Sequence, residues 1–304
     1  MKKRGRIVPA LLALVMVLSA VTVYAVETEN GAPTAENLEL CTYRGVSVGG
    51  RFAAVDPEGE ALSFEITTEP GKGVVEVGEN GRFVYTPAEN KKGKDYFGYR
   101  AVDASGNRSE EATVIITIMK QKSKVTYSDL HGDATEFAAM YLTENGIYTG
   151  ALLGGEYIFD ADAPVSRGEF LAMCMECSGR DILSAVSRTG FADDAAIPVW
   201  MKPYVSTAVM CGAVKGYAAE GANVFEPEKP VSFYEAAVML SSAAGMEDVA
   251  NTAGETVPVW AGQAVSNLTA YDIADSLSVS NPDALTRGEA AVMIAAAAMR
   301  LNEE

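Results

Sequence analysis

The second half of this chain repeats itself at a spacing of 66 residues, and this repetition constrains the fold more than any other feature of the sequence. Eight residues recur at that offset: Gly146, Gly150, Phe159, Pro164, Val165, Ser166, Glu169 and Met173 match Gly212, Gly216, Phe225, Pro230, Val231, Ser232, Glu235 and Met239. A third, degenerate copy follows, in which Pro258-Val259-Trp260 matches Pro198-Val199-Trp200 and Thr286 to Met293 matches Ser232 to Met239. Such self-similarity predicts three supersecondary units that stack to share one core.

We name these units copy 1 (127–180), copy 2 (181–246) and copy 3 (247–304). Each is predicted to contain an aromatic-rich helix, a glycine-bounded loop and a second helix. The second helix begins with an S/T-x-x-E capping box, whose hydroxyl and carboxylate satisfy free backbone N–H groups. The three boxes start at Ser166, Ser232 and Thr286. These hydroxyl and glutamate side chains therefore have structural roles that need no ligand.

Two of the three boxes place an arginine, Arg167 or Arg287, at the first helical position. Positive charge there opposes the helix dipole and costs roughly a few tenths of a kcal/mol. A guanidinium beside free N–H groups suits a carboxylate or a phosphate. We therefore predict an anion site at these arginines, with an ordinary exposed side chain as the alternative.

The first half of the chain follows a different pattern, with apolar and polar residues alternating from about Pro33 to Ile118. The alternating runs are separated by turn signals, of which Asn80-Gly81 is a strong predictor of a hairpin. Short strands about ten residues apart, with no helical period among them, predict an antiparallel β-sandwich. The chain is thus expected to be multidomain, with an all-β sandwich at 26–118 followed by an all-α three-repeat bundle.

Two further segments complete the predicted domain plan. Residues 1–25 have the order of a secretory signal peptide: a basic start, an apolar run from Ile7 to Val23 and small residues up to Ala25. We expect cleavage after Ala25, the alternative being a short membrane anchor. Residues 119–126 are rich in lysine and are predicted to form a short solvated linker. The mature chain is then expected outside the membrane.

Charge excludes several classes of function. The 24 Lys and Arg against 41 Asp and Glu give a net charge of −17, so nucleic acid and anionic membranes would be repelled. A single histidine argues against His-based hydrolases and His-rich metal sites. The pair Cys174 and Cys177 has redox or zinc spacing, but it lies on one face of an apolar helix, without a second CxxC. We predict buried core thiols there.

The blocks AVDPEGEALSFEITTEPGKGVVEV, GRFVYTPAEN, GKDYFGYRAVDASGN and EATVIITI resemble, in order, the bacterial cadherin-like or Ig-like modules of surface proteins. The resemblance implies a spacer or adhesion module. Some members of the family bind calcium through the acidic loop that corresponds here to Asp56, Glu58 and Glu60, with Asp103 nearby. Oxygen ligands suit calcium. Glutamates replace two of the usual aspartates, so we favour a solvated acidic turn and expect no firm cofactor.

The second half resembles S-layer homology domains through YSDL at 127–130, NGIYTG at 145–150, FDADAPVSRGEF at 159–170, FADD at 191–194, FEPEKPVSFYEAAVML at 225–240 and LTRGEAAVMI at 285–294. The resemblance implies three repeats, the third degenerate. Their grooves would bind secondary cell-wall polysaccharide, often pyruvylated, or another peptidoglycan-linked polymer on Gram-positive walls. The binding residues it implies are Asp129, Arg167, Asp193, Trp200, Trp260 and Arg287. A domain with 8 basic against 25 acidic residues in 127–304 needs such local cations to hold an acidic polymer.

These residues predict a non-catalytic, secreted, S-layer-associated protein anchored to the cell wall. If grooves form between neighbouring copies, Arg167 should meet Trp200 and Arg287 should meet Asp129, and we expect Arg167 to contribute most to binding. One alternative is a wall-active carbohydrate enzyme built on paired acids such as Asp193 and Asp194. Another is a calcium-dependent adhesin, which differs only in what the sandwich does.

Overall fold

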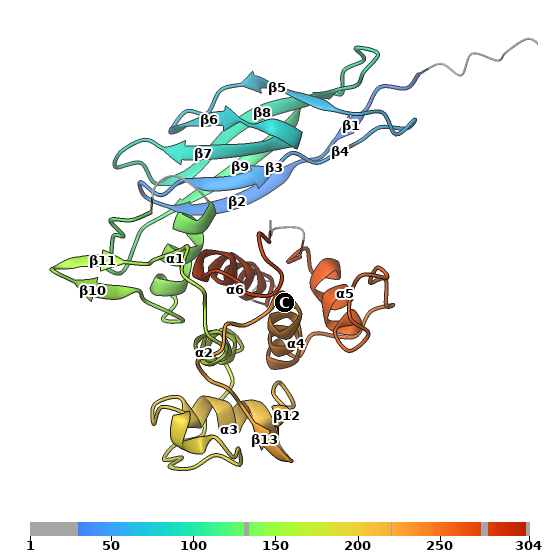
Figure 1. Cartoon of the computed structure of the whole chain (residues 1–304). Helices are drawn as coiled ribbons and strands as arrows, with labels where there is room; N and C mark the ends of the chain where they lie inside the picture. The colour runs from blue at the N-terminus through green and yellow to red at the C-terminus, as the bar shows by residue number, and fades with distance from the viewer. Residues whose placement is uncertain (1–29, 131–133, 220, 275–278, 302–304) are drawn as a thin grey trace, which may run out of the picture.

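The structure is a computed structural model that describes residues 30–130, 134–219, 221–274 and 279–301. The predicted signal peptide and its cleavage site lie outside these residues. Figure 1 shows two parts, a β-rich N-terminal part and a helical C-terminal part. None of the helices in the described ranges is both long and apolar enough to cross a membrane.

The N-terminal part is a sandwich of two sheets. The four-stranded sheet has the order β2-β9-β8-β5, with β2 (Leu38–Tyr43), β5 (Ser63–Thr68), β8 (Gly93–Val102) and β9 (Ala112–Met119). The three-stranded sheet has the order β3-β7-β6, with β3 (Val48–Arg51), β6 (Gly73–Val77) and β7 (Arg82–Pro87). The short strands β1 (Thr34–Ala35) and β4 (Ala54–Val55) pair with each other. Aromatic residues fill the space between the sheets, and the ring of Phe52 stacks on those of Tyr99 and Phe83 with centroids 4.3 and 4.5 Å apart.

The predicted hairpin is present, since β6 and β7 pair in antiparallel register around the turn at Glu79–Gly81. Asn80 and Gly81 both have positive φ angles, of 55° and 73°, which explains why this dipeptide stands there. The prediction of a wholly antiparallel sandwich is wrong at one pair. The first long strand, β2, lies beside the last, β9, and runs parallel to it. Alternation sets which face a side chain occupies but not which strands become neighbours.

The C-terminal part contains two helices per copy. The lead helices are α1 (Ala134–Glu144), α3 (Lys202–Met210) and α5 (Gly262–Ala270). The capped helices are α2 (Arg167–Cys177), α4 (Phe233–Ala244) and α6 (Arg287–Leu301). Where glycine-bounded loops were predicted, copies 1 and 2 have hairpins, formed by β10 (Ala151–Leu153) with β11 (Glu156–Ile158) and by β12 (Tyr217–Ala219) with β13 (Ala222–Val224).

A closed ring of backbone hydrogen bonds joins the three copies just before their capped helices. The N–H of Val165 donates to the carbonyl of Leu285 (3.0 Å), that of Leu285 to Val231 (2.9 Å), and that of Val231 back to Val165 (3.1 Å). All three side chains are fully buried. The helices α2, α4 and α6 pack together around this ring (Figure 1). The ring therefore fixes each capped helix against the loop of a neighbouring copy.

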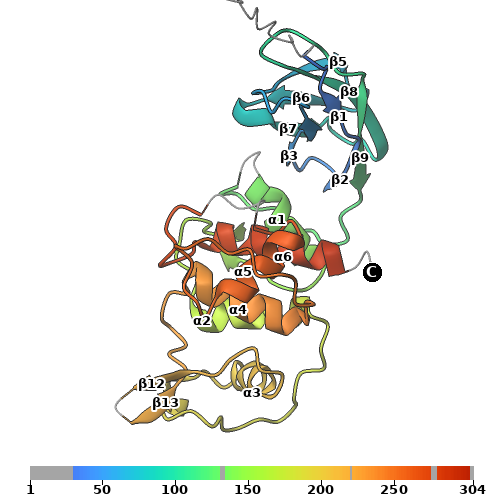
Figure 2. The ribbon, with the colours of Figure 1, turned by 90° about the vertical axis from the view of Figure 1, so that its right-hand side faces the viewer.

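The two parts are connected by a segment that is bound to the helical part over much of its length. The Glu144 carboxylate at the end of α1 accepts the N–H groups of Lys122 (2.5 Å) and Ser123 (3.0 Å). Val125 is buried, and the ring of Tyr43 on β2 stacks on that of Phe137 on α1 at 6.1 Å. In the linker 119–126 the three lysines are exposed, while Val125 is buried. Figure 2 shows α1 facing the sandwich, with α3 and the β12–β13 hairpin at the opposite end of the molecule.

Candidate functional site

The first N–H groups of the capped helices are already occupied by backbone carbonyls of neighbouring copies. Arg167 and Gly168 donate to Lys229 (2.9 Å) and Pro227 (3.0 Å), and Phe233 donates to Pro282 (2.9 Å). At the start of α6, the N–H groups of Arg287 and Gly288 donate in the same way to the carbonyls of Ala163 and Ala161. The predicted anion site cannot use these N–H groups, because packing between copies satisfies them.

The two predicted aspartates shape the turns on which these junctions are built. The Asp129 carboxylate accepts the N–H groups of Phe159 (3.0 Å) and Asp160 (2.6 Å). The Asp193 carboxylate accepts those of Phe225 (2.9 Å) and Glu226 (2.8 Å) in the same way. The second residue of each turn is left-handed, with φ of 58° at both positions. Asp129 and Asp193 therefore stabilise strained turns and are largely engaged by the chain itself.

Arg167 is buried between copies 1 and 2. Its side chain is only 4% exposed, and its Nη1 lies 3.3 Å from Oε1 of Glu235, the capping glutamate of copy 2. Nε donates to the carbonyl of Phe225 (3.1 Å), and the guanidinium lies 4.4 Å from the centre of the Tyr217 ring. Burial raises the pKa of Glu235, but hydrogen bonds from Tyr217 and the Ser232 N–H, with the charge of Arg167, lower it overall. The anion that Arg167 holds is thus internal.

Arg287 occupies the equivalent position between copies 3 and 1 but is less completely engaged. Its Nη1 donates to the carbonyls of Phe159 (3.0 Å) and Asp160 (2.9 Å) and lies 3.6 Å from the Asp160 carboxylate. Its side chain is 15% exposed, and its Nε is buried without a hydrogen-bond partner. Arg287 and Asp129 bind opposite sides of the same turn. The expected meeting of Arg287 with Asp129 is thus replaced by bonds from both residues to Phe159 and Asp160.

A groove of about 360 Å³ runs between copy 1 and the lead helix of copy 2. Its floor is formed by α2 and residues 146–149, and its wall by Trp200 and Tyr204 of copy 2. Trp200 is 55% exposed, and its ring lies edge-on to that of Tyr204, with centroids 6.3 Å apart. The Tyr204 hydroxyl donates to Glu176 (2.5 Å), and Glu169 completes the capping box below. We name this the Trp200 groove.

The Trp200 groove does not include Arg167, so the predicted meeting of Arg167 with Trp200 is wrong. Within copy 2, Arg167 contacts Glu235, Phe225 and Tyr217 instead of Trp200, and Glu235 neutralises its charge. Arg287 does not line the groove either, but it bonds to the carbonyl of Phe159, whose ring lies 5.8 Å edge-on from that of the groove residue Tyr148. Burial raises the pKa of Tyr148, while the charge of Arg287 opposes that shift.

The last predicted site residue, Trp260, is 61% exposed and occupies the corresponding position on copy 3. Its ring lies 6.4 Å from that of Tyr234, which in turn lies 5.6 Å from Phe233. Phe233 and Tyr234, which stand in copy 2 where copy 1 has Arg167 and Gly168, therefore form a row of aromatic rings with Trp260. Three copies thus give three different surfaces.

Sequence reasoning missed the tyrosines of these sites. Tyr148 lies within the NGIYTG segment, yet the residue 66 positions later is Val214, so the repeat gives no signal for it. Tyr217 likewise aligns with Ala151. The only available signal was the position of each tyrosine close to a recurring glycine, Gly150 or Gly216.

The acid pair considered for an enzyme is engaged in the structure. Asp194 accepts a hydrogen bond from Lys202 Nζ (2.8 Å) and two from Thr189. The hydrogen bond from Lys202, followed by those from Thr189, lowers the pKa of Asp194 to about 2. A general acid needs a raised pKa, so the surroundings of Asp194 do not suit it for that one role.

The acidic loop of the sandwich is exposed from Pro57 to Gly59, as a solvated turn would be, whereas Asp56 is buried. Oδ1 of Asp56 accepts the N–H groups of Glu58 (3.0 Å) and Glu60 (2.8 Å), while Oδ2 is buried without a partner. Asp103 accepts hydrogen bonds from the backbone and side chain of Asn107 (2.7 and 2.9 Å). Within the described ranges, no three His, Cys, Asp or Glu side chains are grouped to hold a metal.

The cysteines of α2 are core thiols, as predicted. Cys174 is fully buried and Cys177 is partly buried. Burial raises the pKa of both thiols, that of Cys177 to about 12. Neither is therefore poised as a thiolate.

Comparison with known proteins places these observations in context. Residues 30–120 match the bacterial cadherin-like domain family. The Surface-layer 125 kDa protein of Lysinibacillus sphaericus is 29% identical over 153 residues, which are 46% of this chain and 12% of that protein. The chain therefore spans only a small share of that relative.

Two solved structures show weaker likeness. The SrpA adhesin from Streptococcus sanguinis is 21% identical, covers 55% of this chain and 86% of its own, and has a TM-score of 0.27. The endo-fucoidan hydrolase MfFcnA4 is 17% identical over 31% of this chain and 14% of its own, with a TM-score of 0.25. Likenesses at this level carry no argument about activity. Residues 30–120 thus form a bacterial cadherin-like domain, in a chain that is similar in part to a surface-layer protein.

Proposed function

We propose that this is a non-catalytic cell-surface protein whose three helical copies are S-layer homology repeats that bind secondary cell-wall polysaccharide. The cadherin-like domain would then be a spacer or adhesion module held away from the wall. Similarity to a surface-layer protein supports the location, and the ring of hydrogen bonds among the copies supports their action as one unit.

The observation that carries the proposal is the Trp200 groove. A half-exposed indole offers a flat apolar face on which a sugar ring can stack. Tyrosine and carboxylate groups beside it provide the few polar contacts that orient a ligand. Its volume of about 360 Å³ lies in the range of small-ligand sites.

Charge near the groove points to Arg287 as the residue for an acidic substituent. Its side chain is 15% exposed, against 4% for Arg167, and it bonds to the carbonyl of Phe159, whose ring lies 5.8 Å from that of Tyr148. Arg167, which we first expected to contribute most, is neutralised by Glu235. The proposed order of importance is therefore reversed, with Arg287 and Trp200 ahead of Arg167.

The experiment is calorimetric titration of the full chain with purified wall polymer. Trp200→Ala and Arg287→Gln should each weaken binding by about tenfold or more, the loss expected for one stacking or charge-assisted contact. Arg300→Gln is the matched control, because Arg300 lies on the same helix and pairs with Asp272 in solvent, 45% exposed. If folded Trp200→Ala and Arg287→Gln bind like wild type, the groove is not the site.

A further inference from the structure

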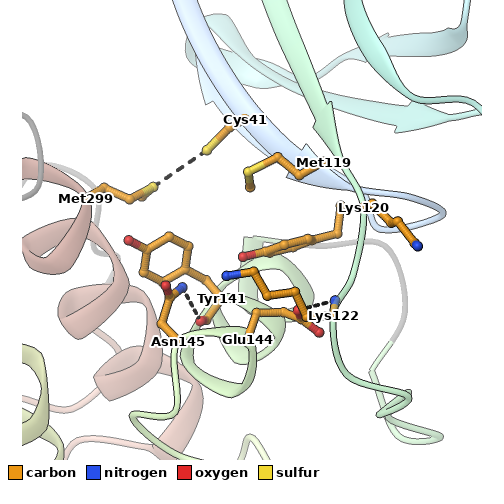
Figure 3. A pocket seen from close by; sticks show the side chains of 9 residues that line it. Cys41, Met119, Lys120, Lys122, Tyr141, Glu144, Asn145 and Met299 are labelled. Carbon is orange, nitrogen blue, oxygen red and sulfur yellow. Dashed lines mark hydrogen bonds between the residues drawn. The ribbon is translucent and has the colours of Figure 1, made fainter.

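A second pocket, of about 340 Å³, lies between the sandwich and the helical part (Figure 3). Three sulfur-bearing side chains line it: Cys41 on β2, Met119 at the end of β9 and Met299 on α6. They come from distant points of the sequence and from both parts of the molecule. It shares no lining residue with the Trp200 groove, although Asn145 of this pocket directly precedes Gly146 of the groove.

The fold brings these three side chains to one place for identifiable reasons. In the parallel register of β2 and β9, Cys41 pairs with Thr117 and Tyr43 with Met119, so Cys41 and Met119 project from the same face of the sheet. That face packs against α1, and α1 packs against α6, which carries Met299. Figure 3 shows the sulfur ends of Cys41 and Met299 directed toward each other, with Met119 beside Cys41.

The distance between two of these sulfur atoms has a direct chemical meaning. Sγ of Cys41 lies 3.9 Å from Sδ of Met299. With metal–sulfur bonds of about 2.3 Å, two ligands of a trigonal site are separated by about 4 Å. The two sulfur atoms are therefore already spaced as ligands of one ion, and the flexible Met119 side chain can supply the third.

We propose that Cys41, Met119 and Met299 bind a soft monovalent cation, Cu(I) or Ag(I). A thiolate with two thioethers is a donor set that selects Cu(I), whereas Ca²⁺ and Mg²⁺ require oxygen ligands. Binding replaces the thiol proton, so one proton is released for each ion bound.

Because the ligands come from both parts, the ion would fasten the cadherin-like domain to the helical part. An ion that binds only this arrangement stabilises it by mass action. The proposal therefore predicts two linked effects: tight binding of one ion per chain, and a higher melting temperature of the chain in its presence.

The test uses the full chain, reduced and without oxygen, with Cu(I) delivered in competition with a chromogenic Cu(I) chelator. We expect one tightly bound ion per chain. Met119→Leu and Met299→Leu keep the volume of the side chain but remove one sulfur, and each should weaken binding by about tenfold or more. Cys41→Ser should abolish it.

Two controls separate this site from capture by any thiol. Cys211→Ser removes a partly buried thiol of copy 2, and Met210→Leu removes an exposed thioether, so both should bind Cu(I) like wild type. If Met119→Leu and Met299→Leu also bind like wild type, Cys41 acts as an isolated thiol and the proposal fails. It fails equally if wild type releases all Cu(I) to the chelator. Circular dichroism verifies that each variant is folded, and Ag(I) titration repeats the comparison with a redox-inert ion.

Discussion

Removal of the Arg167 side chain should destabilise the helical part rather than affect only a ligand contact. Arg167→Ala leaves the Glu235 carboxylate, whose side chain is 15% exposed, without its cation and the Phe225 carbonyl without its donor. Breaking a buried ion pair from one side typically costs about 3–5 kcal/mol. Glu235 keeps its hydrogen bonds from Tyr217 and the Ser232 N–H, so we expect the lower end, about 3 kcal/mol.

The assay is urea denaturation of the full chain followed by helical circular dichroism. Arg300→Ala is the matched control, since its pair with Asp272 is exposed on both sides and should contribute about 1 kcal/mol or less. A double-mutant cycle with Glu235→Gln isolates the pairwise energy. The account of a buried structural arginine is wrong if the free energy of unfolding of Arg167→Ala lies within about 1 kcal/mol of wild type while polymer binding is lost. Arg167 would then be a ligand-binding residue, as its sequence motif predicted.

Three further predictions concern other contacts. Burial raises the pKa of Glu144, but hydrogen bonds from the Ser123 hydroxyl and from the N–H groups of Lys122 and Ser123 lower it overall. The ionised Glu144 therefore stabilises the folded chain above the pKa of the unfolded state, and this contribution is lost as the pH falls through the lower pKa of the folded state. Melting temperatures of wild type should thus fall on acidification below about pH 4.5, and Glu144→Gln should flatten that dependence; equal pH profiles would contradict this. Ser232→Ala removes the capping box of α4 and should lower the free energy of unfolding, measured in urea, by about 1 kcal/mol. An unchanged free energy of unfolding would mean that the cap does not stabilise the helix. Millimolar calcium should barely change the melting temperature of the sandwich, because Asp56 Oδ1 is already bonded to backbone; a rise of about ten degrees, abolished by Asp56→Ala, would show that the unpartnered Oδ2 is a ligand.

Local features of this fold could be predicted from the sequence because they depend on near neighbours. Asn80-Gly81 has the φ angles of a tight hairpin, and the boxes at Ser166 and Ser232 form with both reciprocal hydrogen bonds. Alternation correctly gave the buried face of β9, where every second residue is in the core. Each of these signals spans only a few residues.

The arrangement of the site depends on which copies become neighbours, and a repeat offset does not contain that information. The groove of copy 1 takes Trp200 from copy 2, and Arg287 of copy 3 bonds to Phe159 behind the groove residue Tyr148. Arg167, from copy 1 itself, forms an ion pair with Glu235 of copy 2. The parallel pairing of β2 with β9 was likewise set by a long-range contact. Predictions failed where the outcome depended on packing between units.

The central claim is that the helical copies anchor this protein to the wall through a secondary polymer. The most direct measurement is co-sedimentation of the full chain with purified cell walls, before and after chemical removal of that polymer, with Trp200→Ala measured in parallel. Our account predicts that wild type sediments with intact walls and stays in solution with stripped walls, while Trp200→Ala binds intact walls much more weakly. Equal binding to intact and stripped walls, or no binding to either, would contradict it.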